Sequence, residues 1–76
     1  MKYAVVIEHT ARGGYSAYVP DLPGFGVAAA TLAEVKALVS EGVPFHIEGL
    51  VLGGFPVPEP TTSTDLVEVP GEYAAQ

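Results

Sequence analysis

Two histidines are the side chains of this sequence best suited to catalysis or metal binding. His9 follows Glu8 near the start of the chain, and His46 precedes Glu48 by two positions. Because side chains on a helix meet at spacings of three or four, His46 and Glu48 cannot form an acid–base pair within one helix. A metal site would need both histidines and a carboxylate to converge through the fold alone. We therefore expect no metal site and interpret both histidines as structural residues.

The stretch Y-V-P-D-L-P-G-F-G at residues 18–26 is the second candidate for chemistry. Asp21 is a single carboxylate in this stretch, and acid–base catalysis needs a partner for it. Gly24 and Gly26 give a G-x-G spacing, but neither an immediate helix nor a third glycine follows, as a phosphate-binding loop requires. Prolines fix φ and an aspartate accepts backbone N–H bonds, so the composition is typical of a rigid corner between strands. We expect no catalytic or cofactor-binding residue and no enzymatic activity.

Length, charge and cysteine content limit the class of protein further. The 76 residues predict one domain over 1–70 and a flexible tail over 71–76. Nine acids against three bases give a net charge of −6, which argues against direct nucleic-acid binding and favours a basic protein partner. No cysteine is present, and no apolar run approaches the ~18–20 residues of a membrane helix, so a cytoplasmic protein is expected. Because so short a chain buries a small core, we expect a homo-oligomer, either a dimer or a tetramer.

Alternating apolar residues predict three strands in the first part of the chain. Residues 1–8 form the first strand, with Tyr3, Val5 and Ile7 on one face. The glycine-containing turn H-T-A-R-G-G leads to a second strand at 15–19, and a weaker third strand covers 25–29. The expected arrangement is a three-stranded antiparallel meander.

The residues T-L-A-E at 31–34 predict the start of a helix. In such a capping box the threonine hydroxyl accepts an unpaired N–H while Glu34 reaches back toward the threonine. Apolar residues then follow at spacings of three and four, which predicts a stripe packed on the sheet. The stripe consists of Leu32, Val35, Val39, Val43, Ile47 and Leu50. The Gly-Gly pair at 53–54 predicts the end of the helix.

The segment G-V-P at 42–44 interrupts this helical pattern. A proline inside a helix removes one backbone hydrogen bond and crowds the carbonyl four residues before it. The helix therefore either kinks near Ser40 or stops near Glu41 and restarts with Pro44 in its first turn. We favour the kink, because the apolar stripe stays in phase across the interruption.

The residues after the helix complete the predicted fold. P-V-P-E-P at 56–60 predicts a stiff, extended exit, and residues 65–69 predict a short fourth strand with Val67 and Val69 on one face. The expected fold class is α+β with the order β-β-β-α-β. It combines the three-stranded antiparallel meander, one kinked helix packed on the sheet, and the short fourth strand.

Five segments in this order resemble the HicB-like antitoxin family. They are Y-A-V-V-I-E, G-G-Y-S-A-Y-V-P-D-L-P-G, T-L-A-E, F-H-I-E-G-L and G-G-F-P-V-P-E-P, which together run from about Tyr3 to Pro60. The resemblance implies a partial ribonuclease-H-like unit without nuclease activity. The sequence departs from the family pattern at Ala29, where a glycine is usual before the helix. It departs again at Gly42 and Pro44, where a regular helix is usual.

The resemblance also implies a partner and a role. Bacterial members of the family bind HicA, a small basic ribonuclease toxin, and cover its active surface. Full-length members usually add a C-terminal DNA-binding domain, which these 76 residues do not include. The predicted function is therefore an antitoxin-type module that neutralises a HicA-like toxin. The alternative is a stand-alone, self-associating structural or regulatory protein of the same family.

Partner binding or self-association needs an exposed surface, whichever of the two functions applies. We place this surface on the rigid corner and on the middle of the helix. The residues expected to form it are Tyr18, Asp21, Leu22, Phe25, Phe45 and His46. Neither hypothesis involves a small-molecule substrate or a cofactor.

Overall fold

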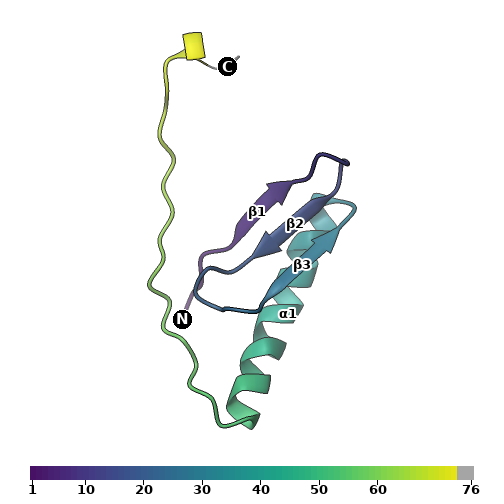
Figure 1. Cartoon of the computed structure of the whole chain (residues 1–76), viewed down its shortest axis with the longest axis vertical. Helices are drawn as coiled ribbons and strands as arrows, with labels where there is room; N and C mark the ends of the chain where they lie inside the picture. The colour runs from purple at the N-terminus through teal and green to yellow at the C-terminus, as the bar shows by residue number, and fades with distance from the viewer. Residues whose placement is uncertain (74–76) are drawn as a thin grey trace.

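The computed structural model of the chain describes residues 1–73. It contains strands β1 (Val6–His9), β2 (Tyr15–Tyr18) and β3 (Gly26–Ala29), helix α1 (Leu32–Leu52) and a short 3-10 turn, η1 (Gly71–Tyr73). The strands form one antiparallel sheet in the order β1-β2-β3, and α1 packs on β2 and β3 (Figure 1). The predicted α+β fold, with a meander followed by one helix, is confirmed.

Two tight connections hold the meander together. In the β1–β2 turn, the N–H of Thr10 donates to the carbonyl of Gly14 at 2.8 Å, and the N–H of Gly14 donates to Thr10 Oγ1 at 3.1 Å. Gly13 adopts φ of 89° in this turn, a conformation that side chains other than glycine rarely take. The register that results places Ile7 opposite Ala17.

The proline-rich stretch is a corner between β2 and β3, as its composition predicts. The N–H of Leu22 donates to the carbonyl of Val19 at 3.0 Å, and the N–H of Phe25 donates to the carbonyl of Leu22 at 3.2 Å. Gly24 adopts φ of 87° between these two bonds. The corner turns Leu22 into the molecule, where it joins the small core beneath α1. The core consists of Ala17, Val19, Leu22 and Val35.

Helix α1 begins at the predicted cap. Thr31 Oγ1 accepts the N–H of Glu34 at 3.1 Å and donates to Glu34 Oε1 at 2.7 Å, so the glutamate reaches back to the hydroxyl. At the other end, the N–H of Gly53 donates to the carbonyl of Gly49 at 3.0 Å, as expected for a helix that ends at the Gly-Gly pair. The helix is continuous through Pro44, so the alternative of a helix that stops and restarts is wrong.

The predicted fourth strand is not found in the structure. Residues 65–69 belong to an extended segment without sheet partners, and the side chains of Leu66, Val67 and Val69 are exposed. Alternation of apolar residues predicts a strand only when an edge lies within reach to complete the ladder. In this chain the segment passes on the β1 side of the sheet without joining it (Figure 1).

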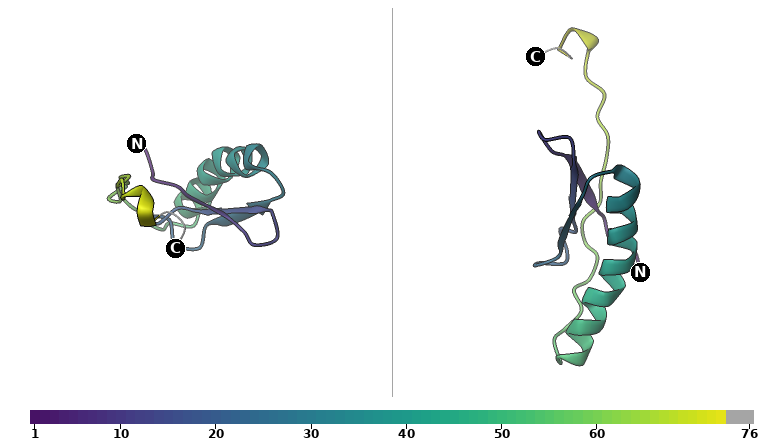
Figure 2. Two further views of the ribbon diagram at one scale, coloured as in Figure 1. Left: turned by 90° about the horizontal axis from the view of Figure 1, so that it is seen from above. Right: turned by 90° about the vertical axis from the view of Figure 1, so that its right-hand side faces the viewer.

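Helix α1 is much longer than the sheet that it covers. Its 21 residues span about 31 Å, whereas a four-residue strand spans about 13 Å. The second half of the helix therefore projects beyond the sheet, as the side view in Figure 2 shows. Within residues 1–73, no helix combines the length and the apolar character needed to cross a bilayer.

Candidate functional site

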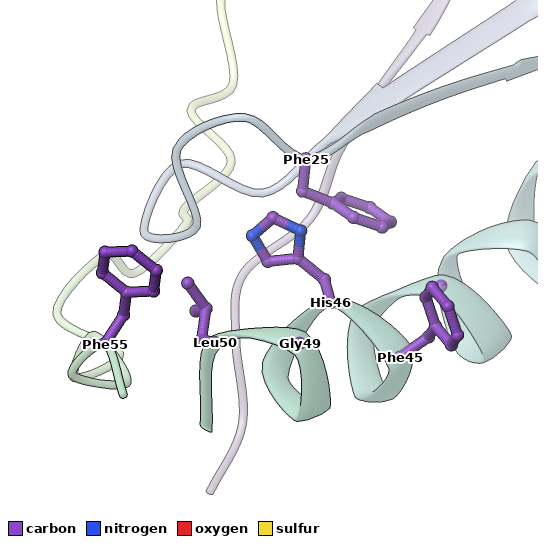
Figure 3. Close-up of a pocket in the computed structure, with 7 residues that line it drawn as sticks. Phe25, Phe45, His46, Gly49, Leu50 and Phe55 are labelled. Atoms are coloured by element: carbon purple, nitrogen blue, oxygen red, sulfur yellow. The ribbon is translucent and has the colours of Figure 1, made fainter. Parts of the chain in front are cut away.

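An apolar groove lies along the projecting half of α1. It has a volume of about 410 Å³ and opens to solvent between the helix, the β2–β3 corner and the turn after the helix (Figure 3). We call it the aromatic groove. Its lining consists of Phe25, Gly42, Phe45, His46, Gly49, Leu50 and Phe55.

Gly42 allows the corner to approach the helix at this groove. A Cβ atom at position 42 would lie 2.8 Å from Cε1 of Phe25, closer than real contacts of this kind, so an alanine would force the ring to shift. Phe25 also meets His46 edge-on, with ring centroids 5.8 Å apart and an interplanar angle of 74°. The glycine that interrupts the helical pattern in the sequence thus makes room for an aromatic ring in the fold.

The turn after the helix supplies the far end of the groove. The N–H of Phe55 donates to the carbonyl of Leu50 at 2.9 Å, which folds the chain back against the helix end. The ring of Phe55 covers Gly53, where a Cβ atom would lie 2.9 Å from the ring. Phe45 and Phe55 remain 77% and 64% exposed, so they offer two aromatic side chains to a partner.

The groove is suited to binding apolar side chains, because its lining is aromatic and aliphatic apart from two glycines and His46. His46 is its one titratable side chain, and its ring packs against Phe25. Across residues 1–73, no group of three or more His, Asp or Glu side chains is placed to hold a metal ion. His9, the other histidine, stacks on Tyr15 with ring centroids 4.7 Å apart, which gives it a structural role between β1 and β2.

The structure places the predicted surface residues in different parts of the fold. Phe25, Phe45 and His46 come together in the aromatic groove. Leu22 is 1% exposed and belongs to the core, so its side chain cannot take part in docking. Tyr18 is partly exposed on β2 and does not line this groove.

Sequence reasoning missed Leu50 and Phe55 as members of the groove, although a signal for each was present. Leu50 follows His46 by four positions, a spacing that places both on one helix face. Phe55 follows the Gly-Gly pair, and a hydrophobic residue just beyond a glycine cap commonly packs back on the last turn. Leu50 was instead predicted to be the last residue of the stripe that faces the sheet.

Asp21 anchors the extended segment that follows the helix. Its Oδ2 accepts the N–H groups of Thr61 at 3.0 Å and Thr62 at 2.9 Å, and its Oδ1 accepts the hydroxyls of the same threonines at 3.2 and 2.8 Å. The Tyr3 hydroxyl adds a second anchor by donating to the carbonyl of Pro58. Asp21 is thus a structural residue that joins the β2–β3 corner to a segment forty residues later.

These hydrogen bonds predict an acid-sensitive anchor. Hydrogen bonds from Thr62, and then from Thr61, lower the pKa of Asp21 below its usual value. Because the folded pKa lies below the unfolded one, the anchor is fully present above about pH 4 and is lost as the pH falls through the folded pKa. We expect amide exchange at residues 61 and 62 to rise in that window, as measured by NMR at a series of pH values.

The variant Asp21→Asn tests this assignment. An asparagine keeps one acceptor oxygen but carries no charge, so exchange at 61 and 62 should already be fast at pH 7 and should not change on acidification beyond the intrinsic rate. Asp65→Asn is the matched control, because the Asp65 carboxylate accepts only the N–H of Leu66 beside it. An acid response at 61 and 62 that persists in Asp21→Asn would contradict the anchor.

Comparison with known proteins gives one family and two relatives. A family model described as the HicB-like antitoxin of bacterial toxin–antitoxin systems matches residues 3–75. An uncharacterised 14.9 kDa protein from the rep–hol intergenic region of Haemophilus phage HP1 is 41% identical over 51 residues, which are 67% of this chain and 38% of the phage protein. A UPF0150 protein of Archaeoglobus fulgidus is 40% identical over 48 residues, which are 63% of this chain and 70% of that protein. The chain thus spans well under half the length of the phage relative.

Proposed function

The chain belongs to the HicB-like antitoxin family of bacterial toxin–antitoxin systems, and from this premise we propose that it neutralises a small basic ribonuclease toxin of the HicA type by covering it. The protein acts in this proposal as a binding module and not as an enzyme. It works in the cytoplasm, where the RNA substrates of such a toxin are found.

The aromatic groove is the observation that carries the proposal. Protein interfaces draw most of their binding energy from a few aromatic or other large side chains that become buried in the complex. Phe45 and Phe55 are large and exposed, and they flank a hollow that could receive an apolar side chain of the partner. Within residues 1–73, no other element covers these two rings.

The charge around the groove supports a basic partner. Glu41 lines a second hollow that shares Gly42 and Phe45 with the groove, and Glu48 is exposed on the same half of the helix. The whole chain carries a net charge of −6. Acidic groups around an apolar centre speed the association of a basic protein and select against acidic ones.

An inhibition assay tests the function. The protein encoded next to this chain, if it is small and basic, should be co-expressed with it and should cleave RNA when it is purified alone. We expect a complex on a sizing column and loss of RNA cleavage when one equivalent of this chain is added. Full cleavage in the presence of excess chain would contradict the proposal.

The variant Phe45→Ala tests the surface. Removing a central aromatic anchor commonly weakens an interface by more than about 2 kcal/mol, which is at least a tenfold rise in Kd. Leu52→Ala is the matched control, because Leu52 is equally exposed on the same helix but does not line the groove. Equal Kd values for the two variants would place the toxin on another surface.

A stand-alone, self-associating protein is the second candidate function. It is favoured by the large area that this chain leaves exposed for its mass. The two candidates differ in a simple observation: a stand-alone protein would form its own oligomer while failing to bind any neighbouring basic protein.

A further inference from the structure

The chain exposes more surface than a self-sufficient domain of its size. Its accessible surface is 5856 Å², whereas a compact monomer of 7.9 kDa is expected to expose about 4400 Å². Its radius of gyration is 15.2 Å, against about 11 Å for a compact chain of this length. Two copies together would have about 2900 Å² to bury, which lies in the range of obligate homodimers.

Much of this excess lies in the extended segment 63–69. Leu66 is 97% and Val67 is 83% exposed, and Val69 is also exposed. Val67 and Val69 alternate with Leu66 and Glu68, so an extended backbone would present the two valines on one face. The segment has the alternating apolar residues of a half-buried strand, but within residues 1–73 it pairs with no other strand.

The outer edge of β1 offers backbone groups with which a further strand could pair. Within residues 1–73 it pairs with β2 alone, so the backbone N–H and C=O groups on its other side lack strand partners. Beside it, an open groove of about 280 Å³ runs between β1 and α1, because the helix packs on β2 and β3 only. We call it the β1 groove, and its lining consists of Val5, Ile7, Lys36, Val39 and Ser40.

We infer that residues 63–69 of one copy add a strand to the β1 edge of a second copy, and that the exchange is reciprocal. The added strand completes the ladder of β1. Its two valines then cover Val5 and Ile7 in the β1 groove. Each copy contributes one strand and receives one, which is the self-complementary contact of a two-fold dimer.

On the face of the sheet that α1 covers, charge favours the β1 edge over the other free edge of the sheet. The segment and the turn after it are acidic, with Asp65, Glu68 and Glu72. Lys36 lines the β1 groove, and the other two cations of the chain, Lys2 and Arg12, lie just before and just after β1 in the sequence. The hollow beside β3 is lined instead by Glu41, which repels an acidic strand.

The anchors described above favour a second copy over the chain's own edge. Asp21 and Tyr3 hold residues 58–62 against the body of the molecule. From that fixed point the segment runs past its own sheet, and within residues 1–73 it does not pair with it; Figure 1 shows the segment apart from β1. The anchors can therefore stay in place while residues 63–69 reach a neighbour.

Engineered cysteines distinguish pairing with a second copy from pairing with the chain's own β1, because the natural chain has no cysteine. Val5 and Ile7 face the β1 groove, so Glu8 lies on the opposite face of β1, where Leu66 and Glu68 of the added strand would also lie. We expect Glu8→Cys combined with either Leu66→Cys or Glu68→Cys to form a disulfide on mild oxidation. On a non-reducing gel the product should have twice the mass of the 7.9 kDa chain.

Each other outcome of that experiment overturns the inference. A disulfide-bonded product of single-chain mass means that the segment pairs with its own β1. The absence of a disulfide in both variants means that the segment does not reach the edge at all. Glu8→Cys with Glu48→Cys is the control for random collision, because Glu48 is exposed on α1, and dimer formation at the same rate there would also overturn the inference.

Light scattering on cysteine-free chains provides the second measurement. We expect the parent to have the mass of a dimer at about 10 µM, and Val67→Asp to raise the dimer dissociation constant at least about tenfold, since a charge would replace a valine in the β1 groove. Leu52→Asp, which adds the same charge at an exposed residue of α1 outside the β1 groove, is the control and should leave the dimer intact. A monomeric parent, or a dimer unchanged by Val67→Asp, would overturn the exchange while leaving the toxin proposal untouched.

Discussion

Replacing Leu22 with alanine should unfold a large fraction of this protein. A buried leucine truncated to alanine costs about 2–5 kcal/mol, from lost transfer energy and from the cavity that remains. A chain of this length has a total stability of about 4–11 kcal/mol. Leu22 is also one of only four buried hydrophobic residues in the described part of the chain, so little else compensates for its loss.

Thermal unfolding followed by circular dichroism measures this effect. At about 4–8 °C per kcal/mol for a small domain, the melting temperature of Leu22→Ala should fall by at least about 10 °C. Leu52→Ala removes the same atoms from a side chain that is 80% exposed, and it should melt within a few degrees of the parent. Similar losses in both variants would mean that the β2–β3 corner does not bury Leu22.

Replacing Pro44 with alanine should have the opposite effect and raise stability. A proline inside a helix is about 3 kcal/mol less favourable than alanine, because its N–H is missing and its ring crowds the preceding turn. Pro44 is exposed, so little packing is lost with its ring. The N–H of an alanine at this position could donate to the carbonyl of Ser40, because the helix is continuous there.

We expect Pro44→Ala to gain about 1–3 kcal/mol, seen as a higher melting temperature and greater ellipticity at 222 nm. Glu48→Ala, at an exposed position of the same helix, controls for the general benefit of adding alanine and should change stability far less. An unchanged Pro44→Ala would mean that the helix in solution is already broken at residue 44.

The surface residues show most clearly where sequence reasoning ends. The sequence analysis placed Phe45 and His46 on a partner surface in the middle of the helix, and both line the aromatic groove. The same reasoning placed Leu22 on that surface, whereas its side chain is buried in the structure. The N–H of Leu22 donates to the carbonyl of Val19, and the N–H of Phe25 donates to the carbonyl of Leu22; these bonds turn the Leu22 side chain inward. Amino-acid composition does not predict the direction of such a turn.

Local signals alone determined the meander, the helix cap, the helix end and the family of this protein. Each depends on neighbours a few residues apart: alternation for the strands, the threonine at 31 for the cap, and the glycine pair at 53–54 for the end. Interactions between residues so close in the chain do not depend on tertiary packing, so they can be recognised from the sequence alone.

Tertiary structure decided three other features: the close fit of Phe25 on Gly42, the anchoring of Thr61 and Thr62 by Asp21, and the absence of a partner for residues 65–69 within residues 1–73. Each joins positions from 17 to more than 40 residues apart, or depends on whether a free sheet edge is within reach. Such contacts are set by the path of the whole chain through space, which local periodicity does not encode.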